Sequence, residues 1–243
     1  MVKTPRPTKA KPGRKVEPPE RLRRYTSLGA LIHMLTIRKL TLLNPATWDD
    51  KNDTYFMSEY KRLMGAKTLL ALCFAMGDET YHHWRVFSSG PDGVCIEFNK
   101  DKLLAHLAAQ PGVTTRMVDY KTIKTLRGKP IPVTDLPFLK RKPYIDECEH
   151  RVIFLDTDTA VEFKDIDIDL NWIDRITLSP WISPALRKSV EQALQAINAK
   201  AGDAPKLKIY RSTLTGNSEW QALTENITGV PAKLATEAEG TAK

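Results

Sequence analysis

Two carboxylates and a guanidinium lie at alternate positions between residues 147 and 151. Glu147, Glu149 and Arg151 are each separated by one residue, and in an extended strand this spacing puts all three side chains on one face. An arginine beside two carboxylates lowers the pKa of one acid and leaves the other as a general base or a holder of hydroxyl groups. An ion-pair network at a sheet edge is the simpler interpretation, and the residues alone leave both open.

A second polar cluster runs from Trp48 to Asp53 and directly follows an expected strand at 39–43. Side chains such as those of Asn52 and Asp53 can cap the next helix and hold a turn. They can equally orient the hydroxyl groups of a ligand. The pattern therefore predicts either a structural turn or part of a binding site.

The segment 78–93 links two expected buried strands and contains His82-His83-Trp84. Neighbours in sequence point in different directions, so we do not expect both histidines to bind one metal ion. Aspartates at 165, 167 and 169 also make a poor metal site, because a strand spaces alternate side chains about 7 Å apart. We expect no metal, and we expect the segment 78–93 to form a wall of a pocket.

Familiar catalytic signatures are missing from the sequence. It contains no Walker-type loop, GxGxxG, HExxH, paired CxxC or GxSxG motif. Three isolated cysteines argue against a disulfide framework and for a reducing compartment, so we expect a cytoplasmic protein. No stretch approaches the roughly 20 apolar residues of a membrane span, and we expect no membrane contact.

Periodicity predicts the elements that must position these residues. Leucine and isoleucine at helical spacing after Ser27 indicate a helix, and Ser183-Pro184 begins another. The apolar run 68–75 indicates a strand buried on both faces, and strands are also expected at 93–98, 149–155 and 163–170. Helices and strands do not alternate strictly. We therefore predict one α+β domain, with a single mixed, mainly antiparallel sheet and flanking helices.

The positive charge of the chain is concentrated at its start. Residues 1–24 hold nine Lys or Arg and two Glu, so this segment carries +7 of the net charge of +8. Five prolines and few apolar residues in 1–22 predict a disordered basic tail that could attract nucleic acid or another polyanion. We expect the domain to cover 23–225 and a flexible C-terminal tail to cover 226–243.

The series of short motifs resembles a large bacterial and phage family, domain of unknown function twenty-nine seventy-one, over about residues 24–215. Two positions depart from that family: Tyr144 stands where Trp is usual, and Thr54-Tyr55-Phe56 follows Asn-Asp where Pro-Phe-Glu is usual. Members of the family look similar to abortive-infection proteins, which implies a role in conflict between phage and host. The resemblance rests on Tyr25, Leu40–Pro45, Trp48–Asp53, Leu72–Phe74, Trp84, Gly93–Phe98, Val118–Tyr120, and Lys140 followed by Tyr144, Glu147, Glu149 and Arg151.

A weaker resemblance, to ADP-ribosyltransferases, offers a mechanism. It is carried by Arg24-Tyr25-Thr26-Ser27, by a helix that ends near Leu40, and by the late Glu147-x-Glu149. It implies that Arg24 holds NAD, that Glu149 is the catalytic acid and that Glu147 positions the acceptor. Further NAD-binding positions are expected at Trp48, Asn52, Asp53, Trp84 and Arg151.

Our leading hypothesis is an NAD-dependent ADP-ribosyltransferase-like effector acting on a macromolecular acceptor. The alternative is a non-catalytic binding module that contacts nucleic acid or a protein through residues 1–22. A metal-dependent hydrolase using Asp49, Asp50 and Glu147 is a weaker third hypothesis, because the sequence has no metal-binding histidine pattern. The sequence does not decide the acceptor or the oligomeric state.

Overall fold

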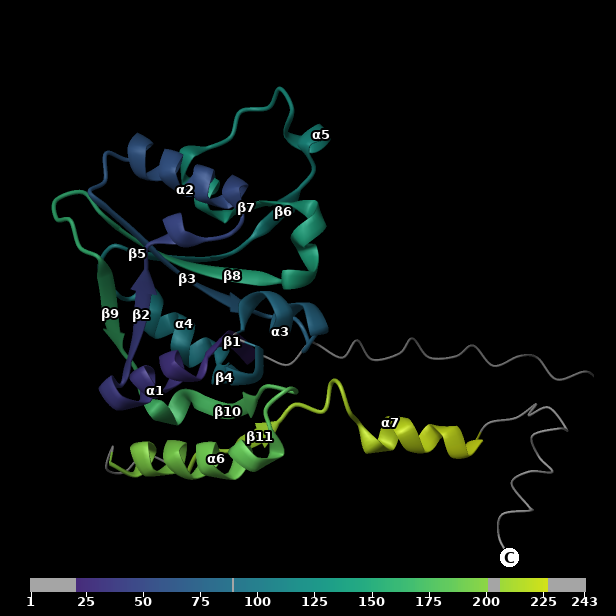
Figure 1. Ribbon diagram of the computed structural model, residues 1–243. Coiled ribbons are helices and arrows are strands. Elements are labelled where there is room, and N and C mark those ends of the chain that lie inside the picture. The colour runs from purple at the N-terminus through teal and green to yellow at the C-terminus, as the bar shows by residue number, and fades with distance from the viewer. Residues whose placement is uncertain (1–20, 89, 201–205, 227–243) are drawn as a thin grey trace, which may run out of the picture.

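The computed structural model describes residues 21–88, 90–200 and 206–226, and a nine-stranded sheet dominates this part of the chain (Figure 1). Nearly all of its strand pairs are antiparallel, and only β10 with β11 is parallel. A separate parallel pair joins β6 and β7. The strands are β1 (Arg21–Ser27), β2 (Lys39–Leu43), β3 (Thr68–Ala75), β4 (Gly93–Asn99), β5 (Val113–Met117), β6 (Asp119–Lys121), β7 (Leu139–Arg141), β8 (Glu149–Asp156), β9 (Phe163–Asp167), β10 (Ile173–Leu178) and β11 (Ile209–Arg211).

Helices flank the sheet, as predicted, and several of them begin at capping side chains. Ser27 accepts a hydrogen bond from the backbone of Ala30 at 3.2 Å, and Asn99 accepts one from Lys102 at 3.0 Å. The helices are α1 (Leu28–Ile37), α2 (Lys51–Leu63), α3 (Tyr81–Phe87), α4 (Lys100–Ala108), α5 (Ile123–Leu126), α6 (Pro184–Ala199) and α7 (Ser218–Ala222). None of the helices in the described ranges has the length and apolar composition needed to cross a bilayer.

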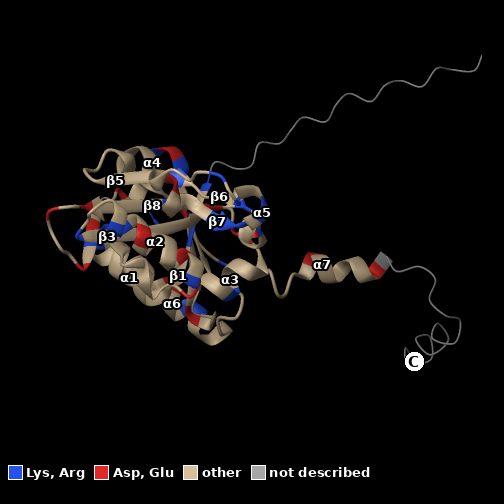
Figure 2. Ribbon diagram, turned by 90° about the horizontal axis from the view of Figure 1, so that it is seen from above, with Lys and Arg blue, Asp and Glu red and all other residues tan. Residues whose placement is uncertain are grey.

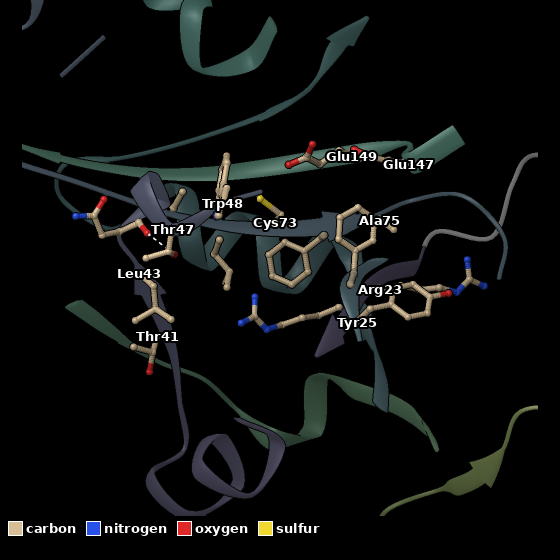
Figure 3. A pocket seen from close by; sticks show the side chains of 16 residues that line it. Arg23, Tyr25, Thr41, Leu43, Thr47, Trp48, Cys73, Ala75, Glu147 and Glu149 are labelled. Atoms are coloured by element: carbon tan, nitrogen blue, oxygen red, sulfur yellow. Dashed lines mark hydrogen bonds between the residues drawn. The ribbon is translucent and has the colours of Figure 1, made fainter. Parts of the chain in front are cut away.

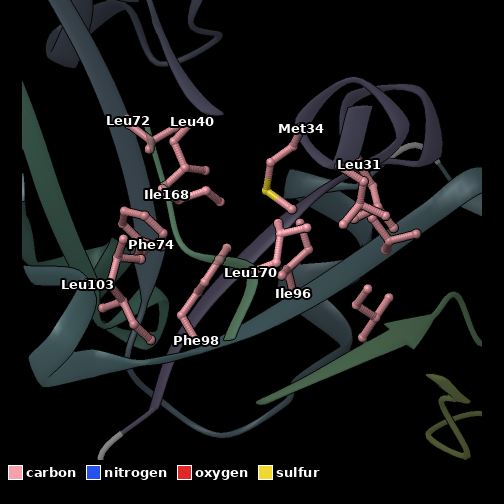
Figure 4. Packing of buried hydrophobic residues seen from close by; sticks show 14 of the residues in the cluster. Leu31, Met34, Leu40, Leu72, Phe74, Ile96, Phe98, Leu103, Ile168 and Leu170 are labelled. Carbon is pink, nitrogen blue, oxygen red and sulfur yellow. The ribbon is translucent and has the colours of Figure 1, made fainter. Parts of the chain in front are cut away.

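Alternate residues of the central strands pack against different helices. Leu72 and Phe74 of β3 join Phe98 of β4 in the main core (Figure 4). Side chains of α1, α4 and α6 also belong to this core. Ala71 on the opposite face of β3 packs with Met57 of α2 in a second cluster. This two-sided burial explains the uninterrupted apolar run of β3.

The sheet divides at one edge of β3. Strand β8 pairs with all eight residues of β3, whereas β2 meets β3 only at Leu43 with Ala71 and β1 only at Arg23 with Ala75. No described strand pairs with the other edge of β3 between those two points. The backbone of 72–74 is therefore left beside a gap between diverging strands.

Some local expectations differ from the structure. Strand β1 pairs with β4 from Arg21 onward and Leu22 is fully buried, so these two residues of the expected tail lie in the sheet. Strand β10, which lies between β11 and β4, was not predicted from the sequence. Residues 1–20 and 227–243, which hold nearly all of both predicted tails, lie outside the described residues.

In the described body, acidic and basic residues are spread over many elements (Figure 2), consistent with its near-neutral sequence.

Candidate functional site

A cavity of about 220 Å³ lies where the sheet divides (Figure 3). Its walls come from strands and loops far apart in sequence, and β3 contributes the stretch left without a neighbouring strand. The lining residues include Arg24 of β1, Trp48 after the 3₁₀ turn Pro45–Thr47, Cys73 of β3, Phe87 of α3, and Glu147 and Glu149.

Arg24 supplies a positive charge to this cavity. Its guanidinium forms no hydrogen bond or ion pair with any residue in the described ranges, in contrast to its neighbour Arg23, which pairs with Glu97 at 3.6 Å. Burial lowers the pKa of Arg24 to about 10, so the side chain is still cationic at neutral pH. A half-buried cation without a partner is suited to an anionic ligand.

Glu149 supplies a fixed negative charge. Arg151 donates to both of its carboxylate oxygens, from Nε at 2.7 Å and from Nη2 at 2.9 Å. Burial alone would raise the pKa of Glu149, but the charge and hydrogen bonds of Arg151 and the charge of Lys140 lower it to about 2. Glu149 is therefore ionised at any physiological pH.

Glu147 lies near Glu149 but does not belong to the strand. It ends a 3₁₀ helix (Lys142–Glu147), and Cys148 follows it with a left-handed φ of 43°. The predicted common strand face is therefore correct only for Glu149 and Arg151. Burial raises the pKa of Glu147, although Lys140 at 2.5 Å opposes that shift.

The two glutamates belong to a buried ion network with Asp53, Lys140 and Arg151. Lys140 Nζ lies 3.3 Å from both Asp53 and Glu149, and Arg151 Nη2 lies 2.6 Å from Asp53. Three carboxylates face two cations, so the network carries one excess negative charge when all five groups are ionised. The guanidinium of Arg151 also lies 5.1 Å from the ring of Trp48, which closes one side of the network.

The remaining predicted site residues do not reach this cavity. Trp84 is fully buried in a small cluster with Tyr25 and Cys95, and its indole donates to Glu79 at 2.6 Å. Asn52 and Asp53 line a neighbouring cavity of about 430 Å³ instead, where Asn52 donates to Asp50 at 3.0 Å. Arg151 contributes indirectly, by holding Glu149.

Sequence reasoning missed two members of the site. Lys140 was named only among the residues that carry the family resemblance and not as a site residue, yet β7 brings it to the three carboxylates. Cys73 was treated only as an isolated cysteine, and its place in the cavity depends on the gap between β1 and β2. Burial raises the pKa of its thiol, so Cys73 is no ready nucleophile at neutral pH.

The described residues contain no group of three or more His, Cys, Asp or Glu side chains arranged to hold a metal ion. In the ion network the carboxylates contact the cations Lys140 and Arg151 instead.

Comparison with known proteins yields limited similarity. No protein-family model matches the chain, and no curated protein matches it. Among solved structures, it is similar to Thermus sp. 2.9 DarT in complex with NAD+, with a TM-score of 0.41 and 11% identity. The same protein in complex with carba-NAD+ gives a TM-score of 0.38 and 10% identity. Each match covers 80% of this chain and 96% of the other. Similarity at this level assigns no activity to this chain.

Proposed function

We propose that this protein cleaves NAD and transfers ADP-ribose to an acceptor, with Glu149 at the nicotinamide ribose and Arg24 at the pyrophosphate. One observation carries the proposal: Arg24 of β1 and Glu149 of β8 line the same cavity although they are 125 residues apart in sequence. A cation without a partner and a fixed carboxylate match the two charges of NAD, which are an anionic pyrophosphate and a cationic nicotinamide.

The size of the cavity decides which part of NAD it holds. Its volume of about 220 Å³ lies below the roughly 300–1,000 Å³ of sites that enclose a whole drug-sized ligand. The cavity therefore takes the nicotinamide riboside end, and the adenosine end lies outside it. The unpaired backbone of 72–74 offers hydrogen-bonding groups along one wall.

The charges support cleavage of the bond between nicotinamide and ribose. Glu149 stabilises the positive charge that develops on the ribose as this bond breaks, and Arg151 keeps it ionised and oriented. Arg24 binds the pyrophosphate. Glu147, the glutamate with the raised pKa, takes the proton of the attacking acceptor. The two carboxylates thus have different protonation behaviour, which is the usual basis for dividing such roles.

Glu149→Gln tests this function, because the amide keeps the shape and removes the charge. With NAD labelled in both halves, we expect nicotinamide release and ADP-ribose transfer to cell lysate to fall by roughly 10²–10³-fold. Exposed Glu162→Gln is the matched control and should retain full activity. Thermal unfolding of each variant separates a chemical effect from loss of the fold.

No nicotinamide release by the wild-type chain above the rate without protein would overturn the proposal. So would a folded Glu149→Gln variant with wild-type activity. A setting in phage–host conflict and a macromolecular acceptor remain predictions from the sequence.

A further inference from the structure

His82 lies beside the buried carboxylate of Glu147 and is itself half-exposed. Its Nε2 is 3.9 Å from Oε1 of Glu147, and the exposed fractions of the two side chains are 47% and 3%. The other carboxylate oxygen, Oε2, receives Lys140 at 2.5 Å. The two oxygens of Glu147 therefore face different groups, one a fixed cation and the other an imidazole that reaches solvent.

Helix α3 holds His82 in this position through its neighbour. The ring of His83 bonds to Thr80 at 2.9 Å and to the backbone oxygen of Glu147 at 3.2 Å. It also stacks on Tyr25, with ring centroids 5.0 Å apart. His83 thus attaches the start of α3 to the backbone of Glu147, so the backbone of His82 is held near the Glu147 carboxylate by buried contacts.

The charged groups around this pair come from several elements. Glu147 faces Lys140 of β7, Asp53 of α2 and Glu149 of β8 within the ion network. His82 faces Glu147, and the ring of His83 lies 6.4 Å away. Lys140 is engaged by three carboxylates at once, and Glu147 is almost wholly buried. Among the described side chains, His82 is therefore the one through which a proton on Glu147 can reach solvent.

We propose that His82 carries the acceptor's proton from Glu147 to solvent, an inference that rests on the proposed transferase function. The acceptor X–H forms a bond from X to the ribose C1′ as the bond from C1′ to nicotinamide breaks, and nicotinamide leaves neutral with the electron pair. The proton of X passes to Oε1 of Glu147 and then to Nε2 of His82, and Nδ1 of His82 releases a proton to water.

A distance of 3.9 Å exceeds a hydrogen bond, so transfer requires either a small rotation of the exposed imidazole or one intervening water. Both are within the range known for groups that exchange protons during catalysis. His82 acts on the proton only through Glu147 and does not touch the reacting ribose. It is therefore a positioning residue.

His82→Gln separates this role from a structural one, because Gln retains hydrogen bonding but cannot carry a proton. We expect nicotinamide release to fall roughly tenfold to a hundredfold, at the lower end of general acid–base effects. The dependence of nicotinamide release on pH should also differ between the wild type and the variant, because only the wild type has an ionisable side chain at this position. Added imidazole should restore nicotinamide release by the His82→Ala variant but not by the Glu147→Gln variant. The exposed His33→Gln is the control and should behave like the wild type.

A measurement without NAD tests the contact itself. The ¹⁵N resonances of the His82 ring in the full chain should move on Glu147→Gln, while those of His33 stay in place. Unmoved His82 resonances would overturn the relay. An active wild type whose His82→Gln variant keeps the same rate and pH profile overturns the relay alone. A wild type that releases no nicotinamide overturns the proposed function, and the relay with it.

Discussion

Glu147 and Glu149 differ in environment although one residue separates them. Glu149 receives two hydrogen bonds from a buried arginine, and its carboxylate is stabilised despite burial. Glu147 has one direct cationic partner in Lys140, so burial outweighs attraction and raises its pKa. The number and geometry of hydrogen bonds, rather than burial alone, decide which of two adjacent carboxylates can accept a proton.

Arg24 is the residue on which NAD affinity should depend. Arg24→Ala should weaken NAD binding roughly 10–100-fold, which corresponds to the loss of one hydrogen-bonded charge contact of about 1.5–3 kcal/mol. Isothermal titration of the full chain with NAD measures this directly. The fold should be unaffected, because Arg24 has no hydrogen-bonding or ionic partner in the described ranges. The exposed Arg127→Ala serves as the control, and equal affinity in the two variants would contradict the prediction.

At the scale of elements, Arg151 of β8 joins α2 to the sheet. Its side chain is 99% buried and bonds to Asp53 of α2, to Glu149 of its own strand and to the backbone oxygen of Pro137 at 2.9 Å. The network therefore ties three segments of the chain together beside the cavity. Buried ion pairs rarely add much net stability, but removing one partner is costly.

Arg151→Met should lower the free energy of unfolding by about 3–5 kcal/mol, because it leaves Asp53 and Glu149 buried with only Lys140 to compensate them. Denaturation in urea measures the change. Asp53→Leu in the same background should recover part of the loss, since it removes one uncompensated charge. Strict additivity of the two substitutions would contradict a coupled network.

At the scale of the whole molecule, the stability of the fold should depend on pH through His150 of β8. This side chain is 7% exposed, and neither of its ring nitrogens has a hydrogen-bond partner among the described residues. Burial, and to a smaller extent the charge of Lys100, lower its pKa to about 4. The folded protein therefore holds His150 in its neutral form.

The unfolded chain protonates His150 near pH 6.5 and the folded chain only near pH 4, so between these values the unfolded state binds more protons. The free energy of unfolding should then fall as pH is lowered through this interval, by up to about 1.4 kcal/mol per pH unit. His150→Leu should flatten that slope in urea denaturation at several pH values. The exposed His33→Leu should leave it unchanged, and an equal effect of both substitutions would exclude His150 as the source.

Features that depend on near neighbours could be predicted from the sequence alone. The run 68–75 predicted β3 with its observed bounds, and Ser27 predicted the start of α1. Ser183-Pro184 predicted the start of α6. These follow from backbone periodicity and local capping, which a short stretch of chain contains in full.

The tertiary structure sets which of the predicted side chains meet. It buried Trp84 away from the cavity, brought Lys140 to three carboxylates, and turned Glu147 off the strand through the left-handed Cys148. The cavity exists because β1 and β2 each meet β3 at one point and then diverge. Such contacts depend on pairings between residues far apart in sequence, whose geometry no local pattern specifies. The sequence shows that Glu147 and Glu149 carry carboxylates, but it does not predict that their pKa values shift in opposite directions.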